Sequence, residues 1–514
     1  MGRGNQQDTM SKITSLCKRR GFIFQSSEIY GGLKGCWDYG PLGVELKRNV
    51  KEAWWRATVT KHDNVVGQDA SIIMHPKVWE SSGHLAGFSD PLVECLLTGS
   101  RFRQDNLEPV SGMVFTFSGA KSQVDDKVSN DIYKVIATDK GAYDKARKTA
   151  REFYSSKRGI EKPELLDEVM EEVVDSVGQF SPDNGGMLSE PRNFNLMLKT
   201  FLGPAEDSST TVYMRPETAQ GIFVNFANVQ QSTRAKIPFG IAQMGKSFRN
   251  EITPKNFTFR TREFEQMELE FFCKPGEDEK WFEYWKEYRM KWYTDLGINP
   301  ENLRYDDHPE DKLAHYAKAC TDIEYLFPFK EEKEWGELEG IANRTDFDLK
   351  AHGEGSGKAL TYFDEETKEH YHPYVIEPSA GGDRATLAFL VDAYHEEGEG
   401  KNKRTVLKFH PSLAPVKVAI LPLVKRDGMP EIADTIYRAF IEEGIPSQME
   451  INSSIGRRYA RQDEIGTPWC ITIDNDTLDN GLVTIRDRDT KEQEQVHKDD
   501  IVDVILKKLR AVRI

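Results

Sequence analysis

The spacing of hydrophobic and polar residues changes several times along the chain, and each change predicts a different kind of element. Residues 11–60 show helical spacing on both sides of a glycine-rich turn, "YGGLKGCWDYGPLG". From residue 193 to residue 272, short apolar runs predict strands. Helical spacing returns at residues 278–297. The aromatic residues close to one face of that helix are expected to pack in the core: Trp281, Trp285, Tyr288 and Trp292.

Two other regions have patterns of their own. After "HPSLAP", strands such as "VKVAILPLV" and "WCITID" alternate with amphipathic helices such as "EIADTIYRAFIEEG", which predicts a separate α/β domain at residues 415–514. Residues 115–180, approximately, are charged, contain alanine and have few large apolar side chains. They predict a helical insertion in the larger domain, residues 1–414, and a solvated decoration of that domain is an equal alternative.

Composition restricts the class of protein without identifying it. The chain has 514 residues, 38% hydrophobic and 30% charged, which fits a soluble globular protein of about two to four domains. No apolar run is long enough to span a membrane, and the polar residues at the start of the chain give no reason to expect a signal peptide. Six scattered cysteines without a C-x-x-C pair fit a reducing, cytoplasmic location. A net charge of −15 means that any contact with nucleic acid must use local basic patches.

Residues 240–247, "GIAQMGKS", match the phosphate-binding pattern G-x-x-x-x-G-K-[ST] letter for letter. Such a loop needs flexible residues in its middle and a helix after it, so that its amides point at phosphate. Here the middle is apolar and strand-like, and Thr253-Pro254 soon ends any regular element. We therefore interpret Lys246 as a strand lysine and reject a phosphate loop.

The segment "GKSFRNEITPKNFTFRTREFEQMELEFF", residues 245–272, combines aromatic rings with charges of both signs. It predicts a hairpin of strands 245–252 and 257–272. Alternation places one set of side chains on one face of the second strand: Phe259, Thr261, Glu263, Glu265 and Met267. The other face receives Arg260, Arg262, Phe264, Gln266 and Glu268. Arginines, a ring and carboxylates suit a nucleotide laid on a sheet, although a salt-bridged hairpin remains an alternative.

Two further segments supply the same types of side chain. "VYMRPETAQGIF" places Arg215 and Glu217 beside a proline turn. "IEPSAGGDRATL" places Glu377 and Ser379 before a glycine pair, and Arg384 at the start of a helix. Both segments are candidates for the same site.

These motifs carry a resemblance to a known family. "FRNE" followed by "FRTREF" resembles motif 2 of class II aminoacyl-tRNA synthetases, and "GGDR" before an apolar helix resembles motif 3. Longer phrases resemble the homodimeric glycyl-tRNA synthetase family: "GFIFQSSEIYGGLKGCWDYGPLGVELK", "SGHLAGFSDPLVEC", "PRNFNLMLKTFLGP", "MRPETAQGIFVNF", "FEQMELEFF", "VIEPSAGGDR" and "RRYARQDEIGTPWCITID". The resemblance covers nearly the whole chain outside about 115–180. A non-catalytic relative and a synthetase for proline or threonine are the alternatives.

The resemblance implies an α+β catalytic domain built on an antiparallel sheet, the class II synthetase fold, with a C-terminal α/β anticodon-binding domain. It implies that glycine and ATP form glycyl-adenylate and that the glycyl group passes to tRNA(Gly), which the enzyme holds by its acceptor end and its anticodon. ATP and Mg2+ are the expected cofactors, and a homodimer is expected, with its interface in a region ending at Pro76.

The resemblance also assigns roles to residues. The expected catalytic residues are Arg249, Arg384 and Glu217. Arg249 should hold the α-phosphate and the glycine carboxylate, and Arg384 should cover the γ-phosphate and sandwich adenine against Phe264. The expected ATP contacts are Arg249, Asn250, Glu251, Phe259, Arg260, Thr261, Arg262, Glu263, Phe264, Glu337, Leu338, Gly381, Gly382, Asp383 and Arg384. Glu337 is also a possible Mg2+ ligand.

Glycine has no side chain, so its pocket must exclude a methyl group and grip the ammonium. The expected substrate contacts are Arg103, with Arg101 as the fallback, Glu217, Phe264, Glu265, Gln266, Met267, Glu268, Glu377, Pro378, Ser379, Ala380 and Gly381. Three of these carboxylates, Glu217, Glu268 and Glu377, are the candidates for the ammonium, and Ser379 is the candidate for a wall beside the α-carbon.

The chain departs from some relatives at the cysteines that bind zinc. Some relatives carry two C-x-x-C pairs that bind zinc. Here the first pair is incomplete, because Thr98 stands where its second cysteine would be, three residues after Cys95. The second region, "SPDNGG", lacks cysteine, so no zinc is expected.

In the C-terminal domain, Arg457, Arg458 and Arg461 predict a basic patch for tRNA phosphates, with a solvated helix start as the alternative.

Overall fold

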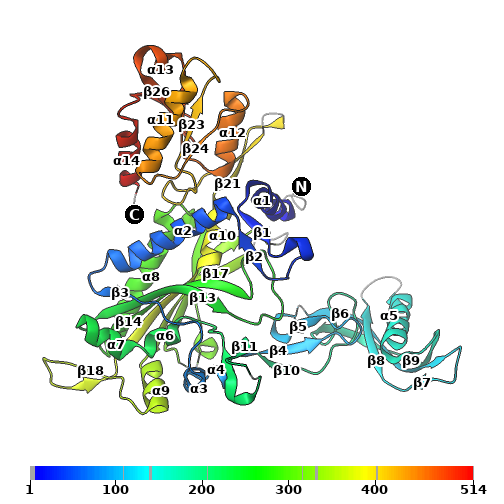
Figure 1. The fold of residues 1–514 in the computed structure, drawn as a ribbon. Coiled ribbons are helices and arrows are strands. Elements are labelled where there is room, and N and C mark those ends of the chain that lie inside the picture. Colours follow the sequence, from blue (N-terminus) through cyan, green and yellow to red (C-terminus); the bar gives the residue numbers. More distant parts are fainter. Residues whose placement is uncertain are drawn as a thin grey trace. The chain divides into compact units, whose positions relative to one another are not determined.

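The computed structural model describes most of the chain, and the described residues divide into two compact units (Figure 1). The described ranges are 6–107, 109–137, 142–204, 206–314, 316–329, 334–400 and 403–512. Unit 1 comprises Met1–Ser82, Leu198–Arg249 and Lys255–Ile514, and unit 2 comprises Gly83–Met197 and Asn250–Pro254. Within the described part of the chain, no helix is long and apolar enough to cross a membrane.

The centre of unit 1 is a sheet with the strand order β15-β16-β17-β20-β14-β13-β3. Neighbouring strands are antiparallel, except that β3 runs parallel to β13. The strands are β3 (Val65–Gly67), β13 (Phe239–Phe248), β14 (Glu263–Cys273), β15 (Leu303–Asp307), β16 (Ala319–Phe327), β17 (Glu334–Thr345) and β20 (Tyr374–Gly381). The expected antiparallel floor is thus confirmed.

One face of this sheet carries the largest apolar core, which is covered by α2 (Pro41–Trp55), α8 (Asp278–Asp295) and α10 (Gly382–Asp392). Met267, Leu269 and Phe271 of β14 point into it, because alternate strand residues share a face. Trp285 and Trp292 are buried there, and Trp281 and Tyr288 pack against it, which confirms the predicted role of the aromatic stripe.

The opposite face of β14 has two parts. Phe272, with Phe239 and Ile241 of β13, lies in an apolar cluster under α6 (Ala219–Phe223), α7 (Phe226–Thr233) and α9 (Phe347–Ser356). Toward the start of β14 the same face is polar, and it positions the candidate site. β13 runs as a strand through Gly240–Ser247, and Lys246 pairs with Glu263 at 2.7 Å, which confirms that this segment is not a phosphate loop.

Shorter elements complete the first part of unit 1. The helices are α1 (Gln6–Arg20) and α3 (Pro76–Ser81). The two-stranded pairs are β1 (Ile23–Gln25) with β2 (Trp37–Tyr39), β11 (Lys199–Phe201) with β12 (Thr211–Tyr213), β18 (Tyr362–Phe363) with β19 (His370–Tyr371), and β21 (Tyr394–Glu397) with β22 (Arg404–Leu407).

The C-terminal part of unit 1 is an α/β module, as the alternating pattern predicts. Its sheet has the order β24-β23-β25-β26-β27, parallel at β23 and antiparallel beyond β25. The strands are β23 (Val418–Pro422), β24 (Ser447–Met449), β25 (Trp469–Ile473), β26 (Leu482–Asp487) and β27 (Gln493–His497). The helices are α11 (Met429–Glu442), α12 (Ile455–Ile465), α13 (Asn475–Asn480) and α14 (Ile501–Ala511).

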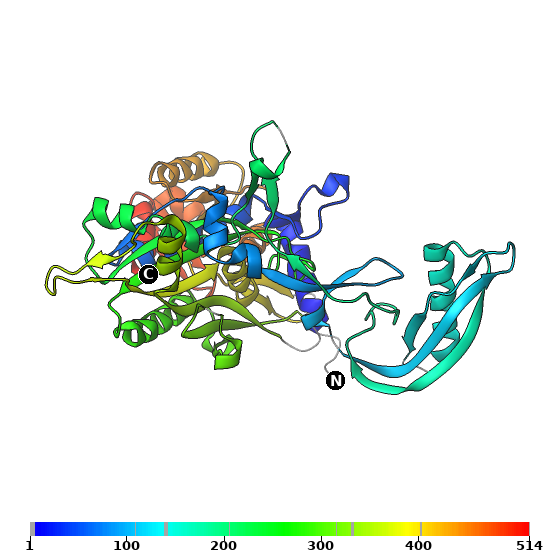
Figure 2. The same cartoon turned by 90° about the horizontal axis from the view of Figure 1, so that it is seen from below.

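Unit 2 is mainly β-structure, so the expectation of a helical insertion is only partly right. Its elements are α4 (His84–Gly87), β4 (Ser89–Glu94), β5 (Arg101–Arg103), β6 (Val110–Ser122), β7 (Val128–Ser129), β8 (Tyr133–Ala137), α5 (Ala142–Arg158), β9 (Pro163–Val177) and β10 (Arg192–Asn195). Helix α5 confirms the prediction over its own length. Figure 2 shows the long cyan strands of this unit from below.

Residues 163–177 were expected to be helical and form a strand instead. They pair with β6 along most of its length, from Ser122↔Pro163 to Val110↔Val177. The acidic residues suggested an exposed helix, but valines recur among them, and β-branched residues favour a strand when a partner edge is present. Tertiary pairing therefore overrides local composition here.

Candidate active site

The predicted hairpin exists, but its strands lie earlier and later than expected. β13 ends at Phe248 and β14 begins at Glu263, so the motif-2 arginines Arg249, Arg260 and Arg262 lie in the connecting segment and not on strands. Pro254 lacks an amide hydrogen for a ladder, and Asn256 and Phe257 both have φ of 59°. The alternation that assigned faces therefore holds only from Glu263 onward.

From there, β14 presents a row of buried polar side chains. Gln266 Oε1 accepts hydrogen bonds from the Ser247 hydroxyl at 2.7 Å and from the Thr218 amide at 3.1 Å. Glu268 is 1% exposed and accepts from the hydroxyls of Ser379, at 2.7 Å, and Thr218. Burial raises the pKa of Glu268. Hydrogen bonds within the protein thus already hold these side chains in place without a ligand.

Glu377 of β20 extends this row through a buried guanidinium. Arg344 Nη1 donates to Glu377 at 2.8 Å, while its Nε and Nη2 donate to Asp348 at 2.7 and 2.9 Å. The guanidinium lies 3.9 Å from the ring centre of Tyr316. Burial raises the pKa of Glu377 to about 8, although Arg344 opposes the shift.

Sequence reasoning did not identify Arg344 or Thr218 as part of this pocket. Arg344 follows Glu337 in "WGELEGIANRTDFDL", a segment that alone resembles an acidic surface loop. The available signal was that Arg344 precedes Asp348 by four residues, although Arg344 lies near the end of β17 and Asp348 in α9, so the pair is not within one helix.

The other end of the site is more exposed and carries the motif-3 arginine. Arg384, in the first turn of α10, places its guanidinium 4.5 Å from the ring centre of Phe259. Its Nη1 pairs with Glu337 Oε2 at 2.9 Å, and its Nε donates to the Phe259 carbonyl at 3.1 Å. Arg384, opposed by burial, lowers the pKa of Glu337. Arg249 lies 5.2 Å from the ring centre of Phe264, so each ring faces a guanidinium.

Asp383 connects several elements below the site. Its Oδ1 accepts from Tyr39 and Lys47, both at 2.7 Å, and its Oδ2 accepts from the Glu265 amide at 2.7 Å. Burial opposes ionisation, but Lys47 holds the pKa of Asp383 below its usual range. Lys51 pairs with Glu265 at 2.5 Å. Asp383 and Glu265 thereby fix α10 and β14 to α2, and their predicted contacts with ligand remain predictions.

Several other predicted residues fall into three groups. Near the polar row, Glu217 accepts from Gln220 at 2.9 Å and Arg249 Nε donates to the Pro216 carbonyl at 3.1 Å. Three others have their side chains in the core and could reach a ligand only by their backbone: Met267, Leu338 and Ala380. A third group, Arg103, Asn250 and Glu251, belongs to unit 2, where Arg103 pairs with Asp90 at 2.9 Å and with Asp105.

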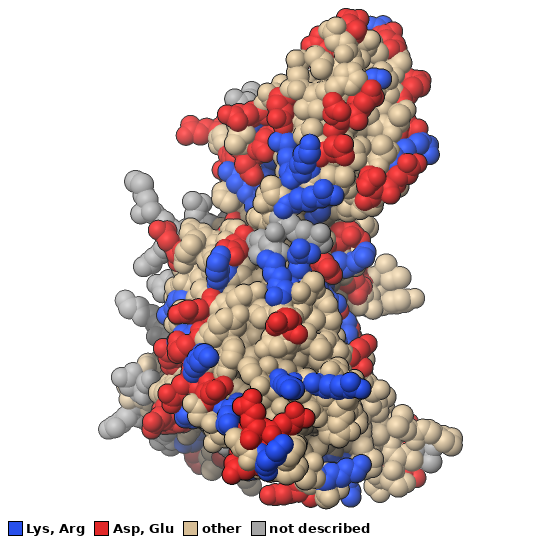
Figure 3. All heavy atoms as spheres, turned by 90° about the vertical axis from the view of Figure 1, so that its left-hand side faces the viewer, with Lys and Arg blue, Asp and Glu red and all other residues tan. Residues whose placement is uncertain are grey.

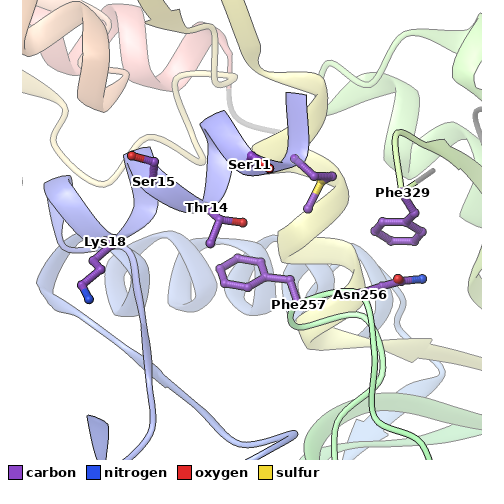
Figure 4. A pocket seen from close by; sticks show the side chains of 8 residues that line it. Ser11, Thr14, Ser15, Lys18, Asn256, Phe257 and Phe329 are labelled. Atoms are coloured by element: carbon purple, nitrogen blue, oxygen red, sulfur yellow. The ribbon is translucent and has the colours of Figure 1, made fainter. Parts of the chain in front are cut away.

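A cavity of about 580 Å³ lies between α1 and the segment that carries Phe257 (Figure 4). Its lining consists of Met10, Ser11, Thr14, Ser15, Lys18, Asn256, Phe257 and Phe329. The Phe329 ring lies 5.1 Å from that of Phe259, the ring beneath Arg384. The cavity therefore adjoins the exposed end of the site through an aromatic pair.

The predicted basic patch of the C-terminal module is not formed as expected. Arg458 is 1% exposed, and its guanidinium donates to the carbonyls of Pro422 at 2.7 Å and Glu450 at 2.9 Å. Arg461 pairs with the Glu450 carboxylate at 2.7 Å, and Arg457 is exposed. In Figure 3 the basic side chains of this module, at the top, lie among acidic ones. The prediction was wrong for Arg458, because helical spacing turns it inward.

Comparisons with known proteins agree with this geometry. Residues 203–394 match the family model "tRNA synthetase class II core domain (G, H, P, S and T)", and residues 417–508 match "Anticodon binding domain". A crystal structure of prolyl-tRNA synthetase from Cryptosporidium parvum, complexed with halofuginone and AMPPNP, has a similar fold, with a TM-score of 0.58 and 13% identity over 98% of this chain and 77% of that one. The antiparallel sheet and its arginine-bearing polar face thus define a class II aminoacyl-tRNA synthetase.

Full-length relatives narrow the class to one family. The chain is 50% identical to the glycine–tRNA ligase of Streptomyces coelicolor over 96% of this chain and 97% of the relative. It is 51% identical to that of Alkaliphilus oremlandii over 98% and 99% of the two chains. It is 48% identical to that of Rhodopirellula baltica over 98% and 100%. The chain belongs to the glycine–tRNA ligase family, as the sequence motifs indicated.

Proposed function

We propose that this chain uses ATP to convert glycine to glycyl-adenylate, with release of pyrophosphate, on the polar face of β14 and β20 and then transfers the glycyl group to tRNA(Gly). The observation that carries the proposal is the pair of buried carboxyls Glu268 and Glu377, with the half-buried Ser379 hydroxyl bonded to Glu268, together with the Arg384–Phe259 stack at the start of α10. A small polar pocket for an ammonium thus adjoins a surface with guanidinium groups and rings, which suits a nucleoside triphosphate.

In the first step the glycine carboxylate attacks the α-phosphorus of ATP, and pyrophosphate leaves. The protein needs no nucleophile, so its contribution is positioning and charge stabilisation. Arg249 holds the α-phosphate and the glycine carboxylate, and Arg260 or Arg262 reaches the distal phosphates. Arg384 covers the γ-phosphate and helps to place adenine against Phe264. In the second step a hydroxyl of the terminal tRNA ribose attacks the glycyl carbonyl, and AMP leaves.

Mg2+ fits the exposed end of the site. Glu337 offers a half-exposed carboxylate whose pKa is lowered by Arg384, so it is ionised at neutral pH and is an oxygen ligand of the type that Mg2+ prefers. When bound, the ion would neutralise phosphate charge. No zinc site is proposed, since Cys95 is buried and its thiol contacts Asn184.

Selectivity for glycine follows from the buried end of the site. Glu217, Glu268 and Glu377 surround the ammonium, and Ser379, held by Glu268 at 2.7 Å, stands beside the α-carbon. A side chain on the substrate would have to displace groups that are already hydrogen-bonded and buried. We expect alanine and serine to be rejected for this reason.

The partners divide between two proposed domains, the catalytic domain at residues 1–414 and the anticodon-binding domain at residues 415–514. The acceptor end approaches along the cavity between α1 and Phe257, where rings can stack on an unpaired base and Lys18 can meet phosphate. We also propose a cytoplasmic homodimer, with the segment that ends at Pro76 in its interface.

Exchange of labelled pyrophosphate into ATP tests the activation step without tRNA. We expect exchange with glycine and none above background with alanine or serine. If no amino acid supports exchange, the proposed function fails and a tRNA-binding relative without catalysis is left. If a larger amino acid supports it, the pocket has been assigned to the wrong substrate.

A further inference from the structure

Glu270 is a buried carboxyl that the proposed reaction does not use. It lies on the polar face of β14, two residues beyond Glu268 and two before the apolar cluster that includes Phe272. Its side chain is 0% exposed, and within the described part of the chain neither carboxyl oxygen has a hydrogen-bond partner. A buried polar group without partners is costly, so its retention requires a reason.

The surroundings of Glu270 are acidic. Three carboxyls lie close together: one oxygen of Glu268, one of Glu270 and one of Glu377 are all within 4.8 Å of one another. The guanidinium that faces this group, Arg344 of β17, is shared by Glu377 of β20 and Asp348 of α9. One cation cannot balance all these carboxyls if each is ionised.

A carboxyl in such a place takes up a proton in preference to remaining charged. Burial, with the nearby Glu377 second, raises the pKa of Glu270 well above its usual range, and Arg344 opposes the shift. A protonated carboxyl is a hydrogen-bond donor. Because Glu377 has an oxygen within 4.8 Å, rotation of the Glu270 side chain can bring its O–H to that oxygen.

We propose that Glu270 is a positioning residue of the amino-acid pocket: it stays protonated and donates a hydrogen bond to Glu377, which holds Glu377 toward the substrate ammonium. The inference rests on the proposed function, because it presumes that glycine binds here. With Glu270 protonated and neutral, the negative charge of the pocket lies on the carboxylates that contact the ammonium.

Two substitutions distinguish three possible roles of Glu270: a neutral hydrogen-bond donor, a charged carboxylate, and a side chain that only fills space. E270Q keeps a neutral donor of the same length, so we expect the glycine KM to stay within about threefold of the unchanged protein. E270L keeps the volume but has no donor, so we expect the glycine KM to rise about tenfold, with kcat and the ATP KM nearly unchanged. Both variants are measured in the full chain by glycine-dependent pyrophosphate exchange between pH 6 and 9.

The dependence of the glycine KM on pH is a second measurement, and it should not change if Glu270 has only a structural role. E270Q should keep the profile of glycine KM of the unchanged protein. In E270L the Glu377 carboxylate loses its donor, so the pH above which KM is level should move upward. If E270L does not fold, E270M replaces it as the variant without a donor. E270Q still separates a protonated from an ionised Glu270, because an ionised Glu270 replaced by an amide would weaken glycine binding and change the profile.

Two results would overturn the inference. If E270Q raises the glycine KM as much as E270L, Glu270 acts as a carboxylate. If E270L matches the unchanged protein in KM and profile, Glu270 only fills space. Failure of the proposed function is read separately, since the unchanged protein would then show no exchange with glycine.

Discussion

The two ends of the proposed active site, the proposed glycine end and the proposed ATP end, are built in different ways. At the glycine end, the side chains of Glu268, Glu377 and Arg344 are buried and come from strands. Arg344 donates to Glu377, and Ser379 donates to Glu268. At the ATP end, the side chains of Arg384 and Glu337 are 27% and 48% exposed, and the partner ring of Phe259 lies in an irregular segment. A rigid end suits rejection of larger amino acids, whereas an exposed end suits a substrate that enters with a metal ion and leaves as pyrophosphate.

Replacing Arg344 should have the largest effect, because it breaks the glycine end itself. Arg344→Met leaves Glu377 and Asp348 buried without their cation, and loss of one partner from a buried ion pair costs about 3–5 kcal/mol. We expect a large fall in the urea midpoint and loss of exchange. Arg384→Met is the matched control, and its midpoint should stay near that of the unchanged protein. Equal midpoints for the two variants would contradict the comparison.

At the ATP end, Arg384→Ala should impair chemistry without weakening the fold. Arg384 contacts only groups near the surface of the site, and removal of one charge-stabilising donor lowers turnover by about 10²–10³-fold. The expected result is a fall of this size in kcat/KM for ATP, with glycine binding unchanged by calorimetry. Arg457→Ala, an exposed arginine of the C-terminal module, is the control and should leave exchange intact.

Between pH 6 and pH 8, the KM for glycine should depend on pH and the KM for ATP should not. In the empty pocket the pKa of Glu377 is about 8, and the substrate ammonium favours the ionised form. Below that pH a proton must leave as glycine binds, so glycine KM should fall by up to about tenfold per unit as pH rises from 6 to 8, then level. The pKa of Glu337 is lowered, so it is ionised throughout, and ATP KM should not follow this profile. A level glycine KM would show that Glu377 is already ionised.

Ser379→Ala tests a single hydrogen bond at the glycine end. The Ser379 hydroxyl donates to Glu268 at 2.7 Å, and Ser379→Ala removes this bond to a buried carboxyl with little change in volume. We expect the glycine KM to rise about tenfold and the ATP KM to stay constant. Thr14→Ala, in the cavity beside α1, is a distant control for the same loss of a hydroxyl. An unchanged glycine KM would exclude Ser379 from the pocket wall.

The sequence predicted the buried end of the site better than the segment that connects β13 to β14. Alternation along β14 correctly placed Gln266 and Glu268 on one face, because strand geometry repeats every two residues. It failed for Arg260 and Arg262, since Pro254 and two left-handed residues end the ladder before them. Arg344 was not predicted, and Arg458 was predicted to be exposed, because the carboxylate of Glu377 and the carbonyl of Pro422 that they contact are distant in sequence, and only the folded chain brings them together.

The smallest expected effect concerns the ring beneath Arg384. The guanidinium lies 4.5 Å from the ring centre of Phe259, and the same ring packs against Phe327 and Phe329 at 5.1 Å. Phe259→Leu keeps most of the apolar contact and removes the cation–π attraction, which is worth about 0.5–1 kcal/mol at exposed sites, so ATP KM should rise about two- to fivefold. ATP titration in the exchange assay measures it. Because the ring orients Arg384 without contacting glycine, a matching rise in glycine KM would mean that the two ends are coupled and not independent.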